Sequence, residues 1–270
     1  MNVAFMMCVY KGDDPDYIAD CLRSIESQSF ININVNIRVY IHIDGVIPKQ
    51  HLDVISEFDI YKKIFSKKPV GLACGLNRII SELEDERYYF RMDADDIMFL
   101  DRVEKQVTFM ESNSDVEVSG GSIYEFVGNI DNVVHRRDYP LSNEMIRKTS
   151  FRACPLAHVS VCFRGGFFLK YGSYPTSYPF NEDIAYWVKL IKENVVFANI
   201  LEPLVYVRMD SAYSRRGINK MKSEFLVYLR HNLSHGKLTI WPFARVFLRL
   251  LPVSLTAFLY SSKVRSFFTR

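Results

Sequence analysis

The sequence predicts an α/β fold with a mixed, mostly parallel sheet flanked by helices, followed by a helical C-terminal segment. Three observations support this. Short apolar runs alternate with amphipathic segments through the first half of the 270-residue chain, which is typical of a parallel sheet with helices on both faces. After Gly217 the pattern becomes helical and basic. Hydrophobic residues make up 49% of the chain, enough for one large domain or a domain with an appendage.

The first half of the chain supplies its elements in regular order. Residues 3–10 form a continuous apolar run, as in a strand buried on both faces. A helix should follow from Pro15, with Asp14 as its N-cap and proline at the first helical position. The same reasoning predicts strands at 35–43, 61–65 and 87–92, and helices at 52–58, 71–83 and 101–110.

The second half is less regular, and no internal repeat is visible in it. We predict extended segments at 116–127, 133–139, 158–164 and 195–209, and helices at 143–151 and 183–192. The alternation therefore weakens where the predicted parallel sheet gives way to more variable structure.

Charge is distributed unevenly along the chain. Residues 215–270 contain 11 Lys and Arg but one acidic residue, Glu224, whereas the remainder has 23 basic and 30 acidic residues. A basic, aromatic-rich tail on an acidic body suggests contact with an anionic surface. Nucleic acid is a poor fit, because the basic residues are interleaved with large aliphatic ones rather than forming a polar stripe.

Cysteine spacing and hydropathy bear on the compartment. The five cysteines show no C-x-x-C spacing, which favours reduced thiols and a reducing compartment. The N-terminal apolar run lacks the preceding basic residues of a signal peptide. No run approaches the ~20 apolar residues that span a bilayer. We therefore expect a protein that is cytoplasmic or peripheral to a membrane.

Polar residues follow three of the predicted strands. They are residues 10–13 (Tyr-Lys-Gly-Asp), the pair Asp44-Gly45, and residues 93–96 (Asp-Ala-Asp-Asp). Because ligands of parallel α/β sheets bind beyond the carboxyl ends of the strands, these segments should meet at one edge and form a site.

The acidic segment 93–96 has its own chemistry. Its three carboxylates repel one another, which is tolerable on a solvated loop or where a cation neutralises them. Oxygen ligands favour Mg²⁺ or Mn²⁺, and Mg²⁺ usually takes one or two carboxylates together with substrate phosphates. The alternative is a solvated acidic turn in which Asp96 caps the next helix.

Residues 91–97 (Arg-Met-Asp-Ala-Asp-Asp-Ile), followed by Asp101-Arg102, resemble the D-x-D region of family 2 glycosyltransferases, which have the Rossmann-like GT-A fold. Further segments resemble landmarks of that family in the same order, over roughly residues 3–210. These segments are residues 9–12 (opening strand and turn), 21–28 (first helix), 43–45 (end of the second strand), 71–77 (G-L-A-x-A-L-N), 157–164 (acceptor-side strand) and 181–187 (E-D-x-x-x-W).

The resemblance implies a catalytic domain at 1–212, with a nucleotide-binding half at 1–100 and an acceptor half at 101–212, and a basic amphipathic helical tail at 213–270. It also implies inverting transfer of a hexose, glucose or galactose, from a UDP-sugar. The tail is similar to that of bacterial enzymes of O-antigen, capsule or exopolysaccharide synthesis, whose acceptor would be an undecaprenyl-diphosphate-linked saccharide. Six residues would contact the nucleotide: Val9, Tyr10, Asp44, Asn77, Asp93 and Ala94.

Metal binding and catalysis would fall to other residues that match the family's motifs. Asp95 would ligate Mn²⁺ or Mg²⁺, and Asp183 would be the general base, which removes the acceptor proton on the face opposite the leaving diphosphate. Adjacent Glu182 should raise the pKa of Asp183 by like-charge repulsion. His158 and Trp187 would lie on the acceptor side.

One segment departs from the family pattern. Many relatives carry a histidine after a Y-x-x-R-type strand, and it completes the metal shell. Here residues 205–210 (Val-Tyr-Val-Arg-Met-Asp) place Asp210 where that histidine would fall. Asp210 or water alone would then serve as the remaining ligand.

The proposed site residues also have structural interpretations, and two other protein classes compete. A phosphotransferase would need a nucleophilic Asp near the first strand, and a non-catalytic scaffold binding sugar nucleotide or membrane would not need both Asp95 and Asp183. The structural alternatives are a turn for Asp44-Gly45, a solvated helix face for Asn77, helix-dipole stabilisation for Glu182-Asp183, a structural role for His158, and core packing for Trp187.

The tail should lie in a membrane interface. Arg245 and Arg249 are four residues apart on one helical face, and Phe243 and Phe247 occupy another. Such a helix places cations on anionic headgroups, so residues 241–270 would hold the protein at the cytoplasmic side of the inner membrane. The alternative is a pair of helices packed on the catalytic domain.

Overall fold

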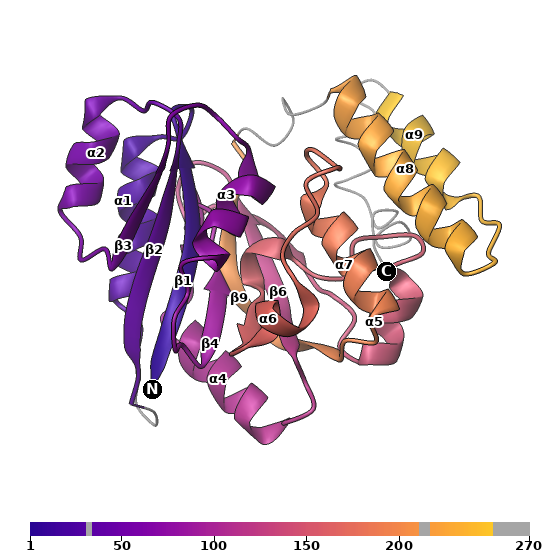
Figure 1. The fold of residues 1–270 in the computed structure, drawn as a ribbon, viewed down its shortest axis with the longest axis horizontal. Coiled ribbons are helices and arrows are strands. Elements are labelled where there is room, and N and C mark those ends of the chain that lie inside the picture. The colour runs from indigo at the N-terminus through magenta and orange to yellow at the C-terminus, as the bar shows by residue number, and fades with distance from the viewer. Residues whose placement is uncertain (31–33, 211–216, 251–270) are drawn as a thin grey trace.

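The computed structural model describes residues 1–30, 34–210 and 217–250. Their strands form one sheet in the order β3-β2-β1-β4-β8-β6-β9-β5, with β7 paired to β6 (Figure 1). The first four of these run parallel to one another: β1 (Asn2–Tyr10), β2 (Asn36–Asp44), β3 (Lys62–Ser66) and β4 (Tyr88–Arg91).

The other half of the sheet is mixed. β6 (Val118–Phe126) and β9 (Phe197–Arg208) are parallel to each other, whereas β8 (Cys162–Arg164) is antiparallel to β4 and β6. Two strands complete the antiparallel pairs: β5 (Ile97–Met98) on β9 and β7 (Val133–Arg137) on β6. The predicted mixed, mostly parallel sheet is confirmed.

Helices cover both faces of the sheet, as the alternation predicted. One apolar core joins the sheet to α1 (Pro15–Glu26), α2 (Lys49–Ser56) and α4 (Arg102–Ser112). A second core joins the opposite face to α3 (Leu72–Ile80), α5 (Asn143–Thr149), α6 (Phe167–Tyr171) and α7 (Glu182–Lys192). β1 feeds both cores, because successive side chains of a strand point to opposite faces.

Local signals place two of the helices. Asp14 caps α1, since its carboxylate accepts the Asp16 N–H at 2.9 Å, and Pro15 occupies the first turn, as predicted. Gly75 lets α3 approach β2 closely, because a Cβ there would lie 2.5 Å from His42 Nδ1. Real Cβ atoms do not come that close to another heavy atom, so this contact requires glycine.

The predicted strand at 158–164 is partly wrong. It begins as a 3₁₀ turn, η1 (His158–Ser160), and only β8 is extended. The Ser160 hydroxyl bonds both the N–H and the C=O of Gly121 in β6, at 3.1 and 3.2 Å. A side chain therefore takes the place of the backbone ladder here. The two-residue strand β5 and the short helix α6 were not predicted.

The C-terminal helices α8 (Ile218–Ser234) and α9 (Trp241–Leu250) pack against each other, and α8 also packs on α7 (Figure 1). Across the described parts of the chain, no helix has the length and apolar character needed to cross a membrane. The predicted domain boundary at 212, and residues 251–270 of the tail, lie outside the described residues.

The orientation of α9 differs from the prediction. Arg245, expected on lipid headgroups, points into the protein, where it pairs with Glu224 at 2.7 Å and donates to the Arg152 carbonyl at 2.9 Å. The exposed residues of α9 include Phe243, Phe247 and Leu250, spaced as one helical face. The expectation for Arg245 is therefore wrong, and the side chain of Arg249 lies outside the described residues.

Candidate functional site

The three polar strand ends meet at one edge of the sheet. Tyr10 at the end of β1 is in register with Asp44 at the end of β2. Arg91 at the end of β4 is in register with Met6, so Asp93 follows beside the same edge. Burial raises the pKa of the Cys8 thiol between them, and Asp93, Asp44 and Asp13 add to the shift. One carboxylate from each strand end therefore raises the pKa of the same thiol.

The acidic turn after β4 holds its carboxylates close together. Oxygens of Asp93, Asp95 and Asp96 lie within 4.8 Å of one another. Their environments differ, since the Asp93 side chain is 40% exposed whereas Asp96 is buried. Burial, followed by repulsion from Asp95 and Asp93, raises the pKa of Asp96 well above its ordinary value.

Asp96 does not cap the following helix, so the alternative of a capping turn is wrong in that respect. β5 intervenes, and the N-cap residue of α4 is Asp101. The Asp96 carboxylate instead accepts the backbone N–H of Arg208 at 2.8 Å. Asp96 therefore joins the acidic turn to the end of β9.

Arg208 holds this turn from the other side, and sequence reasoning assigned it no role. Its Nε donates to the Asp95 carbonyl at 3.1 Å, and its Nη1 donates to the Gly128 carbonyl at 2.9 Å. The guanidinium also lies 3.6 Å from the Tyr17 ring centroid, a cation–π contact. The sequence signal for it was the arginine of the Y-x-x-R-type segment, two residues before Asp210.

Two predicted nucleotide contacts have bonds within the protein. Asp44 accepts the N–H groups of Val70 and Gly71 at 2.7 and 2.9 Å. Asn77 exchanges two hydrogen bonds of 2.9 Å with the backbone of Tyr174. These bonds fix the loop before α3 and join α3 to the chain before α7.

The remaining predicted nucleotide contacts differ in exposure. Val9 and Ala94 are buried, whereas Tyr10 is 48% exposed at the sheet edge. Tyr10 is therefore the one of these three whose side chain is open to a ligand.

Glu182 and Asp183 open α7, at N1 and N2 after the N-cap residue Asn181. Phe180 just before them has a positive φ of 67°, a conformation that few non-glycine residues adopt and that sets the entry into the helix. The Asn181 side-chain amide donates to the Lys220 carbonyl at 3.0 Å, so α8 holds this helix start in place.

Both acids of this pair hold protons more tightly than ordinary carboxyls. Burial and then repulsion from Asp183 raise the pKa of Glu182 to about 7. Burial also raises the pKa of Asp183, and there it is the largest cause rather than the predicted repulsion from Glu182. Arg91 opposes both shifts, which places its charge in the neighbourhood of the pair.

His158 and Trp187 are packed rather than open. His158 Nε2 lies 2.9 Å from the Tyr174 hydroxyl, and burial followed by Arg91 holds its pKa well below the ordinary value. Trp187 is fully buried in the second apolar core and contacts His158 edge-on. The core alternative for Trp187 is confirmed.

Asp210 is engaged elsewhere. Its exposed carboxylate accepts the Gly128 N–H at 3.0 Å. Among the described residues, the acids whose ligand atoms gather closely enough for a metal are Asp93, Asp95 and Asp96. Asp210 as a metal ligand stays a prediction.

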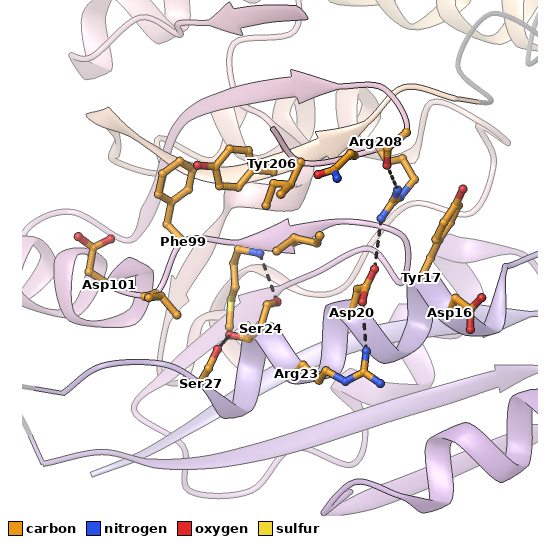
Figure 2. Close-up of a pocket in the computed structure, with 16 residues that line it drawn as sticks. Asp16, Tyr17, Asp20, Arg23, Ser24, Ser27, Phe99, Asp101, Tyr206 and Arg208 are labelled. Atoms are coloured by element: carbon orange, nitrogen blue, oxygen red, sulfur yellow. Dashed lines mark hydrogen bonds and ion pairs between the residues drawn. The ribbon is translucent and has the colours of Figure 1, made fainter. Parts of the chain in front are cut away.

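An open pocket of about 1010 Å³ lies between α1, β5 and the turn that joins β6 to β7 (Figure 2). Asp20 bridges Arg208 and Arg23 in its wall, at 3.6 and 3.2 Å, and Phe99 stacks on Tyr206. None of the sequence-predicted site residues lines this pocket. Its lining reaches the acidic turn through Arg208 and through Ile97, which follows Asp96, but contains none of the three aspartates of the turn.

The sheet order, the helices on both faces and the acidic turn after β4 together define the GT-A class of transferase fold. The chain belongs to glycosyl transferase family 2, since the model of that family matches residues 5–174.

Curated relatives match over nearly the whole chain. An uncharacterized glycosyltransferase of Haemophilus influenzae is 31% identical over 98% of this chain and all of that protein. The UDP-Gal:alpha-D-GlcNAc-diphosphoundecaprenol beta-1,3-galactosyltransferase of Escherichia coli is 27% identical over 97% of this chain and 96% of that protein. The amylovoran biosynthesis glycosyltransferase AmsE of Erwinia amylovora is 29% identical over 94% and 96%, respectively.

Solved structures share the fold. The mannosyltransferase PcManGT of Pyrobaculum calidifontis, in complex with GDP-Man and Mn²⁺, aligns with a TM-score of 0.65 and 13% identity, over 98% of this chain and 82% of that one. S. aureus TarS 1–349 in complex with UDP-GlcNAc aligns with a TM-score of 0.64 and 14% identity, over 99% and 75%. Sequence identity this low supports the common fold alone.

Proposed function

We propose that this glycosyltransferase moves a hexose, glucose or galactose, from a UDP-sugar to a lipid-linked saccharide, with inversion at the transferred carbon. The product would belong to a surface polysaccharide. The observation that carries this proposal is that two clusters of acidic residues, the acidic turn and the Glu182-Asp183 pair, lie near Arg91. The acidic turn follows Arg91 directly, and the Glu182-Asp183 pair lies close enough for the Arg91 charge to oppose the rise in both pKa values.

The acidic turn fits a divalent cation. Three carboxylates with oxygens within 4.8 Å offer the hard oxygen ligands that Mn²⁺ and Mg²⁺ take. Asp95 is our choice for the ligand, because the family resemblance places it at the second aspartate of the D-x-D motif, whereas Asp96 is buried and bonded to Arg208. Bound there, the ion would offset the charge that develops on the departing diphosphate. Asp210 remains a candidate for a further ligand.

On the nucleotide side, Asp93 would contact the ribose or base, with Asp44 and the exposed Tyr10 at the neighbouring strand ends. Asp44 can accept a further bond, because a carboxylate has about four acceptor positions and two are used by Val70 and Gly71.

Asp183 would accept the proton of the acceptor hydroxyl as that oxygen attacks the sugar. Burial raises its pKa, which makes it a stronger base than a solvated aspartate once it is ionised. Glu182, whose pKa is raised to about 7, would be a second proton acceptor beside Asp183. The fixed position of Asp183 also helps, because a base that is held next to the acceptor hydroxyl lowers the entropic part of the barrier to proton transfer.

The acceptor would be a diphosphoundecaprenol-linked saccharide, a class named for the E. coli relative. The exposed Phe243, Phe247 and Leu250 of α9 would lie in the membrane interface and bring the site to that lipid from the cytoplasmic side. This surface differs from the one expected from sequence, because the apolar face, rather than Arg245, is turned outward.

A hydrolysis screen of UDP-, GDP- and dTDP-hexoses tests the donor class, each with Mn²⁺ and with EDTA. We expect release of UDP from a UDP-hexose in Mn²⁺ and loss of that activity in EDTA. Turnover of none of the donors would favour the alternative of a non-catalytic sugar-nucleotide or membrane-binding scaffold. Full activity in EDTA would contradict the metal-dependent mechanism.

Vesicle binding tests the membrane surface separately. We expect Phe243→Glu/Phe247→Glu to reduce co-sedimentation with phosphatidylglycerol vesicles several-fold. Leu169→Glu is the matched control, because Leu169 is a 95% exposed apolar residue on α6, away from this face. Equal binding by all three proteins would refute the assignment of α9 as the contact surface.

A further inference from the structure

Arg91 is a buried arginine with unused hydrogen-bond donors. Its side chain is 2% exposed at the end of β4. Tyr89, two residues earlier, packs in the core beside α7, so Arg91 points to that same face. One guanidinium nitrogen, Nη2, donates to the Asp93 carboxylate. Its Nε and Nη1 have no hydrogen-bond partner among the described residues.

A second arginine shows how unusual this is. Arg102 is equally buried, yet its nitrogens are all engaged: Nε with Gln106 at 3.0 Å, Nη2 with the Arg91 carbonyl at 3.1 Å, and Nη1 with the Met92 sulfur at 3.3 Å. Leaving buried N–H donors unpaired is costly, and most proteins avoid it. The two unpaired donors of Arg91, Nε–H and Nη1–H, therefore suggest that a ligand binds there.

The surroundings of Arg91 indicate what that partner is. Its charge opposes the rise in the pKa values of Tyr174, Glu182 and Asp183 and adds to the lowering for His158, so these groups lie within its electrostatic reach. Arg91 thus contacts Asp93 on the nucleotide side, and its charge reaches the proposed base Asp183. In an inverting displacement, the sugar that is transferred lies between the leaving group and the base.

We propose that Arg91 binds the transferred sugar of the donor, with its Nε–H and Nη1–H donating to hydroxyl oxygens of the hexose. This inference rests on the proposed function. Asp93 already balances the charge of Arg91, so the two free groups offer directed donors rather than net charge. Neutral hydroxyl oxygens match that better than a diphosphate, whose charge would fall to the metal.

The test compares UDP with UDP-hexoses. Binding of UDP, UDP-glucose and UDP-galactose is measured by calorimetry in Mn²⁺ for the wild type, Arg91→Lys and Arg91→Met. Lysine can keep the ion pair with Asp93 but lacks the planar fork. We expect UDP affinity within about 3-fold of the wild type for Arg91→Lys, and UDP-hexose affinity lowered on the order of 10²-fold for both variants, from two lost bonds to a charged donor.

Thermal stability separates this role from a structural one. Arg91→Met removes two buried donors that have no partner together with the ion pair to Asp93, whose 40% exposed carboxylate water can solvate, so the melting temperature of the ligand-free variant should change little. Arg102→Met, the matched control, should lower it, because bonded partners are left unsatisfied.

Three outcomes would overturn the assignment. Equal losses of UDP and UDP-hexose affinity in Arg91→Lys would make Arg91 a nucleotide or folding residue, and undiminished UDP-hexose binding would remove it from the sugar site. A wild type that binds neither UDP nor the UDP-hexoses would refute the proposed donor class, and the sugar contact with it. The first two outcomes leave the proposed function intact, so the failures are distinguishable.

Discussion

The acidic turn after β4 and the acid pair that opens α7 both lie within reach of the Arg91 charge but are held in opposite ways. In the turn, Asp93 pairs with Arg91, Asp96 accepts the Arg208 N–H, and the Asp95 carbonyl accepts from the Arg208 side chain. The pair at α7 is half-buried, and the pKa values of both acids are raised, to about 7 for Glu182. The first group is fixed in position, and the second is poised to take up protons.

The difference matches the work we propose for each group. A site that binds a metal and a diphosphate benefits from ligands whose positions are set beforehand. A general base benefits from a pKa nearer to the working pH, which burial provides. Substitutions that keep shape but remove charge can therefore separate the two groups.

The largest effect is expected for Asp183→Asn. Loss of the base should reduce transfer by about 10²- to 10⁴-fold, while the affinity for the UDP-hexose stays near that of the wild type. Initial rates and calorimetric binding in Mn²⁺ measure the two quantities. Glu193→Gln, at the other end of α7, is the matched control and should transfer normally. Transfer by Asp183→Asn at the wild-type rate would show that the base is another residue.

The next largest effect is expected for Asp95→Asn. Its loss would weaken metal binding, so we expect roughly 10²-fold lower activity and a shift of the Mn²⁺ requirement to higher concentration. Titration of the rate with Mn²⁺ measures this. The exposed Asp115, just after α4, serves as the control in Asp115→Asn. An unchanged Mn²⁺ dependence would argue against Asp95 as the ligand.

Glu182→Gln should change the free energy of unfolding by an amount that depends on pH. The folded pKa of about 7 lies above the ordinary 4.5, so ionised Glu182 destabilises the folded state. This penalty is absent below pH 4.5, grows as the pH rises toward 7, and is complete above it. The variant should gain about 3 kcal/mol over the wild type at pH 8 and little at pH 4, measured by urea unfolding. A gain independent of pH would contradict the raised pKa.

The smallest effect is expected for Asp96→Asn. Burial already favours the uncharged form of Asp96, and asparagine keeps an oxygen for the Arg208 N–H. Activity should stay within about 3-fold of the wild type, since surrogate hydrogen bonds differ by roughly 0.5 kcal/mol. A loss as large as that of Asp95→Asn would place Asp96 among the metal ligands and erase the distinction within the turn.

Much of the fold could be predicted because its signals are local. The apolar run of β1, the Asp14 cap and the polar residues after three strands can be read within a few positions of the chain. The parallel arrangement then brings Asp44 and Asp93 to one edge without further information.

The parts that were missed depend on contacts between distant residues. Arg208 reaches Asp95 across 113 positions, and Arg245 turns inward to Glu224 across 21. The unpaired donors of Arg91 are equally invisible in a sequence, because being unpaired is a property of the packed surroundings. Residues 158–160 read as extended from their apolar pattern, but the Ser160 hydroxyl overrides it.

The two hydrogen bonds between Asn77 and Tyr174 have a consequence for how such enzymes diversify. They join α3, in the nucleotide half, to the chain before α7, in the acceptor half, and they bind only backbone atoms of residue 174. This tie therefore constrains the identity of residue 77, and at residue 174 it excludes only proline, which has no N–H to donate. A chimera could exchange the acceptor half for that of a relative and keep the two halves aligned, provided that asparagine is retained at position 77.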